Sequence, residues 1–372
     1  MSRFLNGRYG GLEPYTPGEQ PKVPGRLIKL NTNENPYPPA PGVSKVLQWD
    51  PETAEQLKLY SDPEAAELVG AIAEYYGLET HQVMVGNGSD EILAFAFMAF
   101  QPENGRIYFP EISYSFYPVY CDIFGAKGMK VPLRDDFTVC PSDYYGAEGT
   151  IVITNPNAPT GMALSLGEIE SILDANRNQL VIIDEAYVDF GGESAVSLLD
   201  GHDNLLVVQT FSKSRSLAGA RIGFAMGHED VIADLNKIKF SFNPYNLNRL
   251  SILAGREAIK DREYFRETCR KIIETRESLA AELRELGFEV LPSKANFVFA
   301  RSGHMGGEEY FEALRQRNII VRYFKKPKID DFVRITIGTD EEMKMLIRAT
   351  KEILDEKLRQ EKREGMTKGE KS

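Results

Sequence analysis

Cysteine and histidine are scarce in this 372-residue chain, and the few that occur are widely separated. Cys121, Cys140 and Cys269 form no CxxC pair, which argues against both a disulfide framework and a zinc site and favours a reducing compartment. The four histidines show neither HExxH nor HxH spacing, so the sequence predicts no metal centre.

Long apolar runs and an excess of positive charge are also missing. No apolar run is long enough to cross a bilayer, and the N-terminus lacks the charged and then apolar pattern of a signal peptide, so the cytoplasm is the expected location. The formal net charge of -11 argues against nucleic acid as the main ligand, because binding a phosphate backbone requires a basic surface. A local basic pocket for a small anion is still compatible with this charge.

The composition is otherwise that of an ordinary globular protein, with 42% hydrophobic and 27% charged residues. The length exceeds what one core usually holds, which predicts more than one domain. We expect an extended N-terminal arm over residues 1–40, which are rich in proline and glycine, a large domain over 41–250 and a smaller α/β domain over 251–363. The polar residues 364–372 are predicted to be disordered.

Short apolar runs alternate with helical or loop patterns through the first two thirds of the chain. They read QVMVG, GRIYFP, GMKVPL, GTIVITNP, QLVIIDEAY, NLLVVQTF and RIGFAMG. Such alternation predicts an α/β protein with a mostly parallel, seven-stranded sheet between two layers of helices. Ligands of these sheets bind beyond the carboxyl ends of the strands. The segments GNGSD, NPNAPTG, DEAY and TFSK each follow a strand and are therefore expected around one site.

Two of these segments have several interpretations when each is taken alone. GNGSDEILAF predicts a helix beginning near Ser89, whose free N–H groups favour an anion such as phosphate, although an ordinary capped helix has the same pattern. Asp184 follows a buried strand, so its carboxylate needs a cation or a hydrogen-bond donor. A metal ion, a protonated ring nitrogen and a structural ion pair are all compatible with Asp184.

The segment TFSKSRSLAGARIG is the most specific. Lys213 stands at the end of a buried strand, where a lysine can have a lowered pKa and act as a nucleophile toward a carbonyl. Thr210, Ser212 and Arg221 add two hydroxyls and a cation, a set suited to phosphate. Pyridoxal phosphate combines a carbonyl, a phosphate and a basic ring nitrogen, which a nearby Asp keeps protonated. The combination therefore predicts a pyridoxal-phosphate site.

With these segments, the chain resembles the fold-type I pyridoxal-phosphate transferases, and within them the class II family of histidinol-phosphate aminotransferases. The resemblance covers nearly the whole chain and rests on KLNTNENPYPP, GNGSDE, NPNAPTG, DEAYVDF, SKSRSLAGARIG and VRITIGT. It implies a large domain with a mostly parallel sheet, a smaller C-terminal α/β domain, and a homodimer with shared active sites.

The resemblance also implies a role for each matching residue. Lys213 would hold the cofactor as a Schiff base and shuttle the proton, and Asp184 would pair with the ring nitrogen. Tyr187 would hydrogen-bond the phenolic oxygen, and Tyr114 would stack on the ring. Tyr60 would reach the phosphate of the neighbouring subunit's cofactor. The phosphate-binding set implied within one subunit is Gly88, Ser89, Asp90, Thr210, Ser212 and Arg221.

One position departs from the family pattern. The family usually has Asn immediately before PTG, in contact with the phenolic oxygen, and this chain has Ala158 there. Either Asn157 reaches the cofactor from a shifted loop, or Tyr187 makes that contact alone. Both alternatives stay open at this point.

The substrate's anionic end is assigned to two arginines by the same resemblance. Arg334 and Arg322 could each grip a phosphate ester or a carboxylate with a bidentate contact. For Arg322, a surface position at a strand edge is an equally open interpretation. Asn33 and Glu34 are expected at the mouth of the site, on the N-terminal arm.

The implied reaction is the interconversion of L-histidinol phosphate and 2-oxoglutarate with imidazole acetol phosphate and L-glutamate, a step of histidine biosynthesis. Three alternatives remain: a threonine-phosphate decarboxylase, an aromatic or broad-range aminotransferase, and a cofactor-binding regulatory protein without turnover. A dinucleotide oxidoreductase is not supported, because no GxGxxG fingerprint follows the first strand.

Overall fold

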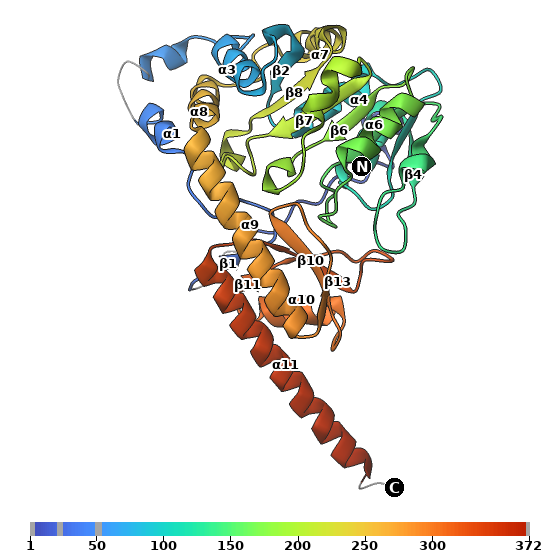
Figure 1. Ribbon diagram of the computed structural model, residues 1–372, viewed down its shortest axis with the longest axis vertical. Helices are drawn as coiled ribbons and strands as arrows, with labels where there is room; N and C mark the ends of the chain where they lie inside the picture. Colours follow the sequence, from blue (N-terminus) through green and yellow to red (C-terminus); the bar gives the residue numbers. More distant parts are fainter. Residues whose placement is uncertain (1–3, 21–24, 49–53, 370–372) are drawn as a thin grey trace.

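The computed structural model describes residues 4–20, 25–48 and 54–369. Within them the chain forms a large domain, built on one wide sheet, and a small domain built from the C-terminal segments (Figure 1). In the described part of the chain, no helix is long and apolar enough to span a membrane.

The large domain contains a seven-stranded sheet, as predicted. Its strands, in spatial order, are β2 (Val83–Gly86), β8 (Gly223–Gly227), β7 (Leu205–Thr210), β6 (Val181–Asp184), β5 (Thr150–Thr154), β3 (Arg106–Pro110) and β4 (Lys127–Val131). Of these seven strands, β8 alone runs in the opposite direction to the others, so the sheet is mostly parallel. The fold class expected from the alternating pattern is therefore confirmed.

Helices cover both faces of this sheet because the strands are apolar at successive positions, and successive side chains point to opposite faces. On one face, Val152 and Ile182 pack with α4 (Ser89–Ala99), α5 (Phe116–Phe124) and α7 (Glu229–Phe242). On the other face, Ile153 and Ile183 pack with α3 (Ala66–Tyr76) and α6 (Leu166–Ala175). The central strands β5, β6 and β7 are buried at every position.

The ends of α3 illustrate how local sequence sets a helix. The segment SDPEAAELVGAIAEYYG predicts a start at Ser61–Pro63 and a stop at Gly77. The helix ends as predicted, because Gly77 takes a left-handed conformation with a φ of 70°. It starts later, at Ala66, where Asp62 accepts hydrogen bonds from the N–H groups of Glu64 and Ala66 at 3.0 and 2.8 Å.

Two helices lead from the large domain into the small one, and the first of them packs in the core of the large domain. They are α8 (Arg249–Lys260) and α9 (Arg262–Glu285), divided at Asp261, whose side chain accepts the N–H of Tyr264 at 3.1 Å. An antiparallel sheet follows, with the spatial order β12 (Arg322–Tyr323), β13 (Phe332–Thr336), β10 (Phe297–Ser302) and β9 (Phe288–Val290).

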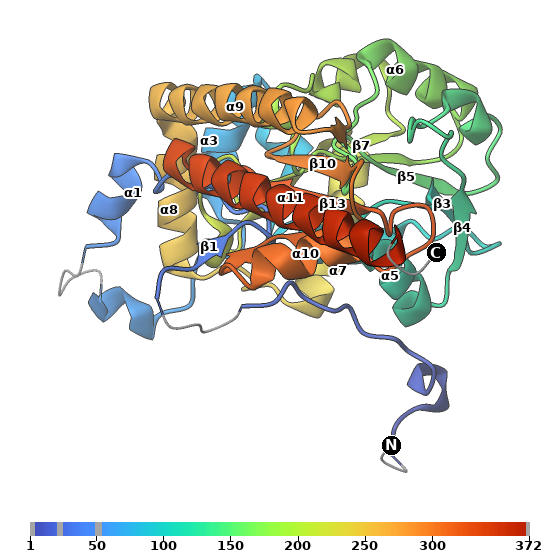
Figure 2. The ribbon, with the colours of Figure 1, turned by 90° about the horizontal axis from the view of Figure 1, so that it is seen from below.

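Helices α9, α10 (Gly307–Arg315) and α11 (Asp340–Gly369) pack around the small sheet. Figure 2 shows α9 and α11 side by side, and Figure 1 shows the end of α11 extending beyond the domain. The tail predicted from residue 364 begins inside α11, so this helix is longer than the sequence indicates. Residues 370–372 lie outside the described part.

The N-terminal arm is more closely packed than its proline and glycine content suggests. Strand β1 (Ile28–Lys29) pairs in parallel with β11 (Ile319–Ile320), and Ile28 and Leu30 join the apolar core of the small domain. The helix α1 (Pro41–Val46) then packs on α8. The expectation of an unpacked arm is therefore wrong from Ile28 onward, because its alternating apolar side chains complete the small domain's core.

Candidate active site

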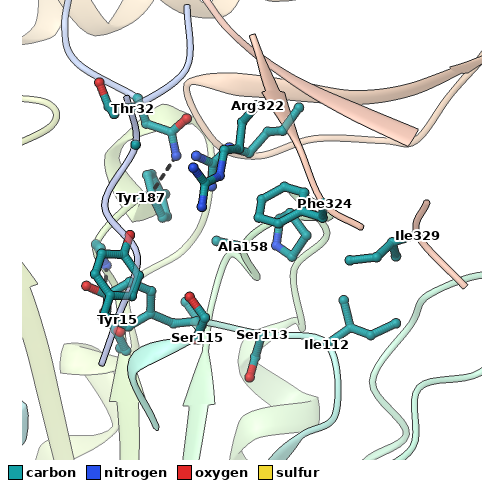
Figure 3. Close-up of a pocket in the computed structure, with 18 of the residues that line it drawn as sticks. Tyr15, Thr32, Ile112, Ser113, Ser115, Ala158, Tyr187, Arg322, Phe324 and Ile329 are labelled. Atoms are coloured by element: carbon teal, nitrogen blue, oxygen red, sulfur yellow. Dashed lines mark hydrogen bonds between the residues drawn. The ribbon is translucent and has the colours of Figure 1, made fainter. Parts of the chain in front are cut away.

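A pocket of about 520 Å³ lies where the carboxyl ends of β5, β6 and β7 meet the small domain and the arm. Figure 3 shows Tyr187 and Thr32 on one side, Phe324 and Ile329 on the other, and Ala158 between them. The predicted site residues that line it are Asn33, Ser89, Asp90, Tyr114, Asp184, Tyr187, Thr210, Ser212, Lys213, Arg221, Arg322 and Arg334. The strand-end segments thus converge where the parallel-sheet rule places a ligand.

Lys213 follows the end of β7, and its half-buried side chain lines this pocket. Its Nζ donates to the carbonyl oxygen of Thr32, on the arm, at 3.0 Å, and lies 5.7 Å from the ring centre of Tyr187. Burial lowers the pKa of the Lys213 amine to about 8, and the positive charge of Arg334 acts in the same direction. A larger fraction of this amine is therefore neutral and nucleophilic near neutral pH than for an exposed lysine.

Asp184 ends β6 and is almost fully buried. Its Oδ2 accepts the Tyr117 hydroxyl at 2.8 Å, and its Oδ1 accepts the N–H of Ala186 at 3.2 Å. Burial raises the pKa of the Asp184 carboxyl to about 6, with these two hydrogen bonds opposing the shift. Among the described residues, no lysine, arginine or histidine forms an ion pair with Asp184, which makes the structural ion-pair interpretation untenable.

Tyr187 is oriented by the arm. The side-chain amide of Asn33 donates to the Tyr187 hydroxyl at 2.9 Å, and Asn33 also accepts the Thr336 hydroxyl at 3.1 Å. Asn157 points elsewhere: its amide donates to the carbonyl oxygen of Ile112 and to the Thr160 hydroxyl, both at 3.0 Å. Ala158 lines the pocket and Asn157 does not. The amide that contacts the Tyr187 hydroxyl is therefore that of Asn33 and not that of Asn157.

A second cluster, at the start of α4, has the chemistry of a phosphate site. Gly88 precedes the helix with a φ of 85°, and a Cβ there would lie 2.4 Å from the Nη2 of Arg221. That Nη2 donates to the carboxylate of Asp90 at 2.8 Å. The hydroxyls of Thr210 and Ser212 lie 3.0 Å apart beside them. Helix N–H groups, hydroxyls and a guanidinium together suit a phosphate dianion.

Aromatic side chains close one side of the pocket. Tyr114 donates its hydroxyl to Asp90 at 2.7 Å. Tyr15, on the arm, stacks on Phe116 with the ring centres 4.4 Å apart and lies 6.4 Å from Tyr114. The sequence did not identify Tyr15, because a lone tyrosine between prolines carries no local signal for a binding role.

The two candidate substrate arginines come from neighbouring strands of the small sheet, where Arg322 and Arg334 are cross-strand partners. Arg334 donates to the carbonyl oxygen of Asn31 at 3.0 Å, while its Nε is buried without a partner among the described residues. Arg322 donates one long hydrogen bond, 3.4 Å, to the carbonyl oxygen of Thr16, and its guanidinium lies 5.4 Å from the ring centre of Phe324. Both guanidiniums thus keep donors available to an anion in the pocket.

Glu34 and Tyr60 lie outside this pocket. Glu34 is bound to Lys29 and accepts the Thr32 hydroxyl at 2.8 Å. Tyr60 is 79% exposed and stacks on Tyr245 with ring centres 4.5 Å apart. Tyr60 therefore contributes no atoms to the lining of this pocket.

No group of three or more His, Cys, Asp or Glu side chains is arranged to hold a metal ion in the part of the chain that the structure describes. The metal interpretation of Asp184 therefore has no supporting ligands among those residues.

Aminotransferases match this chain over nearly its whole length. The family model of aminotransferase class I and II matches residues 25–349. Histidinol-phosphate aminotransferase 2 of Dechloromonas aromatica is 53% identical over 355 residues, 95% of this chain and 99% of the relative. The histidinol-phosphate aminotransferase of Brachyspira hyodysenteriae is 52% identical with the same shares.

Solved structures agree with the fold. The histidinol-phosphate aminotransferase of Clostridium acetobutylicum superposes with a TM-score of 0.81 at 25% identity, covering 89% of this chain and 100% of that one. An L-threonine-O-3-phosphate decarboxylase of Porphyromonas gingivalis has a TM-score of 0.76 at 22% identity, covering 88% and 100%, and shares the fold. By its sequence match over most of its length, the chain belongs to the class I and II aminotransferase family.

Proposed function

We propose that this protein is a pyridoxal-phosphate-dependent histidinol-phosphate aminotransferase. It transfers the amino group of L-histidinol phosphate to 2-oxoglutarate and yields imidazole acetol phosphate and L-glutamate. The observation that carries the proposal is the 53% identity, over 95% of the chain, to a relative named for this activity. The pocket supports it through the chemistry of its residues.

The pocket residues fit pyridoxal phosphate. Asp184 is a buried carboxylate without a cationic partner among the described residues, which suits a protonated ring nitrogen. The cluster at Gly88, Ser89 and Arg221 offers helix N–H groups and a guanidinium to the phosphate. When bound, the cofactor supplies an electron sink and carries the amino group from donor to acceptor.

The side chains then have separate tasks. Lys213 would hold the cofactor through its amine and, once the incoming substrate amine has displaced it, would move a proton at the substrate carbon that bears the amino group. A pKa of about 8 keeps part of that amine neutral near physiological pH, as a base requires. Asp184 holds the proton on the ring nitrogen, and Tyr187 and Asn33 orient the phenolic oxygen.

Arg334 and Arg322 supply the anion-binding part of the substrate site. The orphaned Nε of Arg334 and the weakly engaged guanidinium of Arg322 can form charge-assisted hydrogen bonds to a phosphate or a carboxylate. Both substrates are anionic, so one pair of arginines serves both half-reactions. The net charge of the chain is -11 and repels anions in general, so the local positive charge of the two guanidiniums is what favours an anion at this site.

A homodimer with shared sites completes the proposal. Leu57, Leu59 and Tyr60 are close in sequence and exposed, and Tyr60 stacks on the exposed Tyr245, so these side chains offer apolar surface suited to a second copy of the chain. Tyr60 on that surface is free to enter the neighbouring subunit's site. The cytoplasmic location and the domain bounds near residues 40 and 250 remain predictions.

A screen of half-reactions tests the proposed activity. Purified holoprotein is mixed with histidinol phosphate, histidinol, threonine phosphate or phenylalanine, and the visible absorbance of the lysine-bound cofactor is followed. We expect histidinol phosphate to discharge this absorbance fastest and 2-oxoglutarate to restore it. Release of carbon dioxide from threonine phosphate would indicate a decarboxylase. Equal rates with phenylalanine and histidinol phosphate would indicate a broad-range enzyme. No absorbance change with any amine would indicate a binding protein without turnover.

A further inference from the structure

Tyr117 is a residue that the sequence did not single out, and it touches the most buried acid of the pocket. Its hydroxyl lies 2.8 Å from the Oδ2 of Asp184 and 2.7 Å from the Oγ1 of Thr154. Thr154 and Asp184 end the neighbouring parallel strands β5 and β6 and are register partners. Tyr117 reaches both from α5, which packs on that face of the sheet.

The chemistry of the three groups fixes where the hydrogens lie when Asp184 is ionised. A carboxylate only accepts, so the single hydrogen of the Tyr117 hydroxyl is donated to Asp184. The Thr154 hydroxyl then donates to the Tyr117 oxygen, which forms a chain of two hydrogen bonds that end on the charge. Such chains polarise one another and strengthen the bond to the carboxylate. Protonation of Asp184 would reverse both bonds.

The surrounding aromatic side chains hold Tyr117 in place. It is fully buried, with its ring centre 5.9 Å from that of Phe97 and 5.7 Å from that of Phe109. Burial and the charge of Asp184 raise the pKa of Tyr117 well above its ordinary value, so its hydroxyl stays a donor throughout the physiological range. The donor is therefore both rigid and permanent.

We propose that Tyr117 is a positioning residue, which holds Asp184 ionised so that Asp184 can partner the ring nitrogen of the cofactor. This inference rests on the proposed function, since it takes Asp184 as the ring-nitrogen partner. Burial favours the neutral acid, and an O–H donor that binds only the charged form opposes that preference. Thr154 supports Tyr117 from one bond further away.

The other titratable groups that act on Asp184 are few. Asp90 of α4 raises the pKa of Asp184 through its negative charge, and Tyr120 and Tyr187 face the same carboxylate. Lys213 lines the same pocket. Glu185, the next residue, instead accepts bonds from Ser194, Ala195 and Gln209 outside the pocket lining, and burial raises the pKa of its carboxyl to about 7. A test of Tyr117 must therefore distinguish the titration of Asp184 from that of Glu185.

The test uses the full-length protein stripped of cofactor, with folding checked by circular dichroism. The free energy of unfolding is measured by denaturant titration from pH 4.5 to 8.5 for the parent, Tyr117→Phe, Asp184→Asn and the double variant. Two differences in the free energy of unfolding isolate the titration of Asp184: that between the parent and Asp184→Asn, and that between Tyr117→Phe and the double variant. Glu185 and the histidines cancel in each difference.

The sign of the expected effect follows from the raised pKa. The fold favours protonated Asp184, so the parent loses stability relative to Asp184→Asn as the pH rises from about 4, and the loss levels off near pH 6. Without the Tyr117 donor, the loss should continue to a pH about one to two units higher. Thr154→Val should give a smaller shift in the same direction.

Tyr310→Phe is the matched control, because Tyr310 also pairs its buried hydroxyl with a threonine, Thr350, at 2.7 Å and bonds to no carboxylate of the residues that the structure describes. It should lower stability equally at all pH values. An unchanged levelling pH in both Tyr117→Phe and Thr154→Val would overturn the proposal. The pH dependence of stability needs no turnover, so this test can fail or succeed independently of the half-reaction screen. Weaker binding of pyridoxal phosphate to Tyr117→Phe than to the parent would connect the position of Asp184 to the cofactor.

Discussion

The amide of Asn33 donates a hydrogen bond to the hydroxyl of Tyr187 at 2.9 Å across a separation of 154 residues. Asn33 is itself fixed by Thr336 of β13 and by Asn296, whose amide donates to its carbonyl oxygen at 3.0 Å. The arm, the small domain and the large domain therefore meet at one side chain. At the neighbouring position Ala158, the chain has no amide to offer.

Asn33→Gly should weaken cofactor binding and lower turnover about 3- to 10-fold, the usual effect of one lost hydrogen bond. Glycine is the substitution of choice because Asn33 has a φ of 56°, a conformation that alanine adopts at a cost. The pyridoxal phosphate dissociation constant and kcat are measured. Adding Ala158→Asn should recover part of the loss, and normal values in Asn33→Gly would show that Tyr187 needs no amide partner.

Lys213 should react with pyridoxal phosphate at lower pH than any exposed lysine. The neutral amine is the nucleophile, and a pKa of about 8 means that the rate of capture rises up to about pH 8 and then levels off. Borohydride trapping and peptide mapping at a series of pH values measure this rate. Lys213→Ala should abolish both the label and turnover, whereas Lys325→Ala, on an exposed lysine, should change neither. A label on another lysine would refute the assignment.

Arg322→Ala should lower kcat/KM for histidinol phosphate more than for glutamate, because a phosphate dianion gains more from a second guanidinium than a carboxylate does. Arg334→Ala should damage both half-reactions, since both substrates present an anion to it. Loss of one charge-assisted contact costs about 1.5–3 kcal/mol, roughly 10- to 150-fold in kcat/KM. Steady-state kinetics with each substrate measure the effects. If Arg322→Ala harms both substrates equally, Arg322 does not select phosphate.

Tyr60→Ala and Lys213→Ala proteins should each have little activity, and their mixed dimers should regain it. If Tyr60 acts in the neighbouring subunit's site, the mixed dimer has one site with both defects and one with neither. Activity after subunit exchange should approach half that of the parent per mixed dimer, measured on purified heterodimers with two affinity tags. Heterodimers no more active than the homodimers would place Tyr60 outside the partner's site.

Gly88→Ala should disrupt the phosphate cluster. Its φ of 85° disfavours any side chain, and the new Cβ would lie 2.4 Å from the Nη2 of Arg221. We expect a loss of about 1–2 kcal/mol in stability and a larger loss in pyridoxal phosphate affinity, measured by thermal unfolding and by spectroscopic titration. Gly70→Ala, at an open position in α3, is the control and should stabilise by about 0.5–1 kcal/mol.

The sequence by itself determined the elements whose signals are local. The runs of the seven strands, the stop of α3 at Gly77 and the polar segments after strands each depend on a few adjacent residues, and the parallel-sheet rule then brings Asp184, Thr210 and Lys213 together. That was sufficient for the fold class and for predicting that these residues line one pocket.

Tertiary structure alone decided the partners that come from distant segments. Nothing near Asn33, Tyr15 or Tyr117 in the sequence indicates that they contact Tyr187, Phe116 and Asp184. The same is true of the orientation of Asn157, which depends on Ile112 and Thr160. Local patterns record backbone conformation and burial, whereas a hydrogen bond across 154 residues depends on how packed layers and domains dock, because buried polar groups must find partners wherever the fold supplies them.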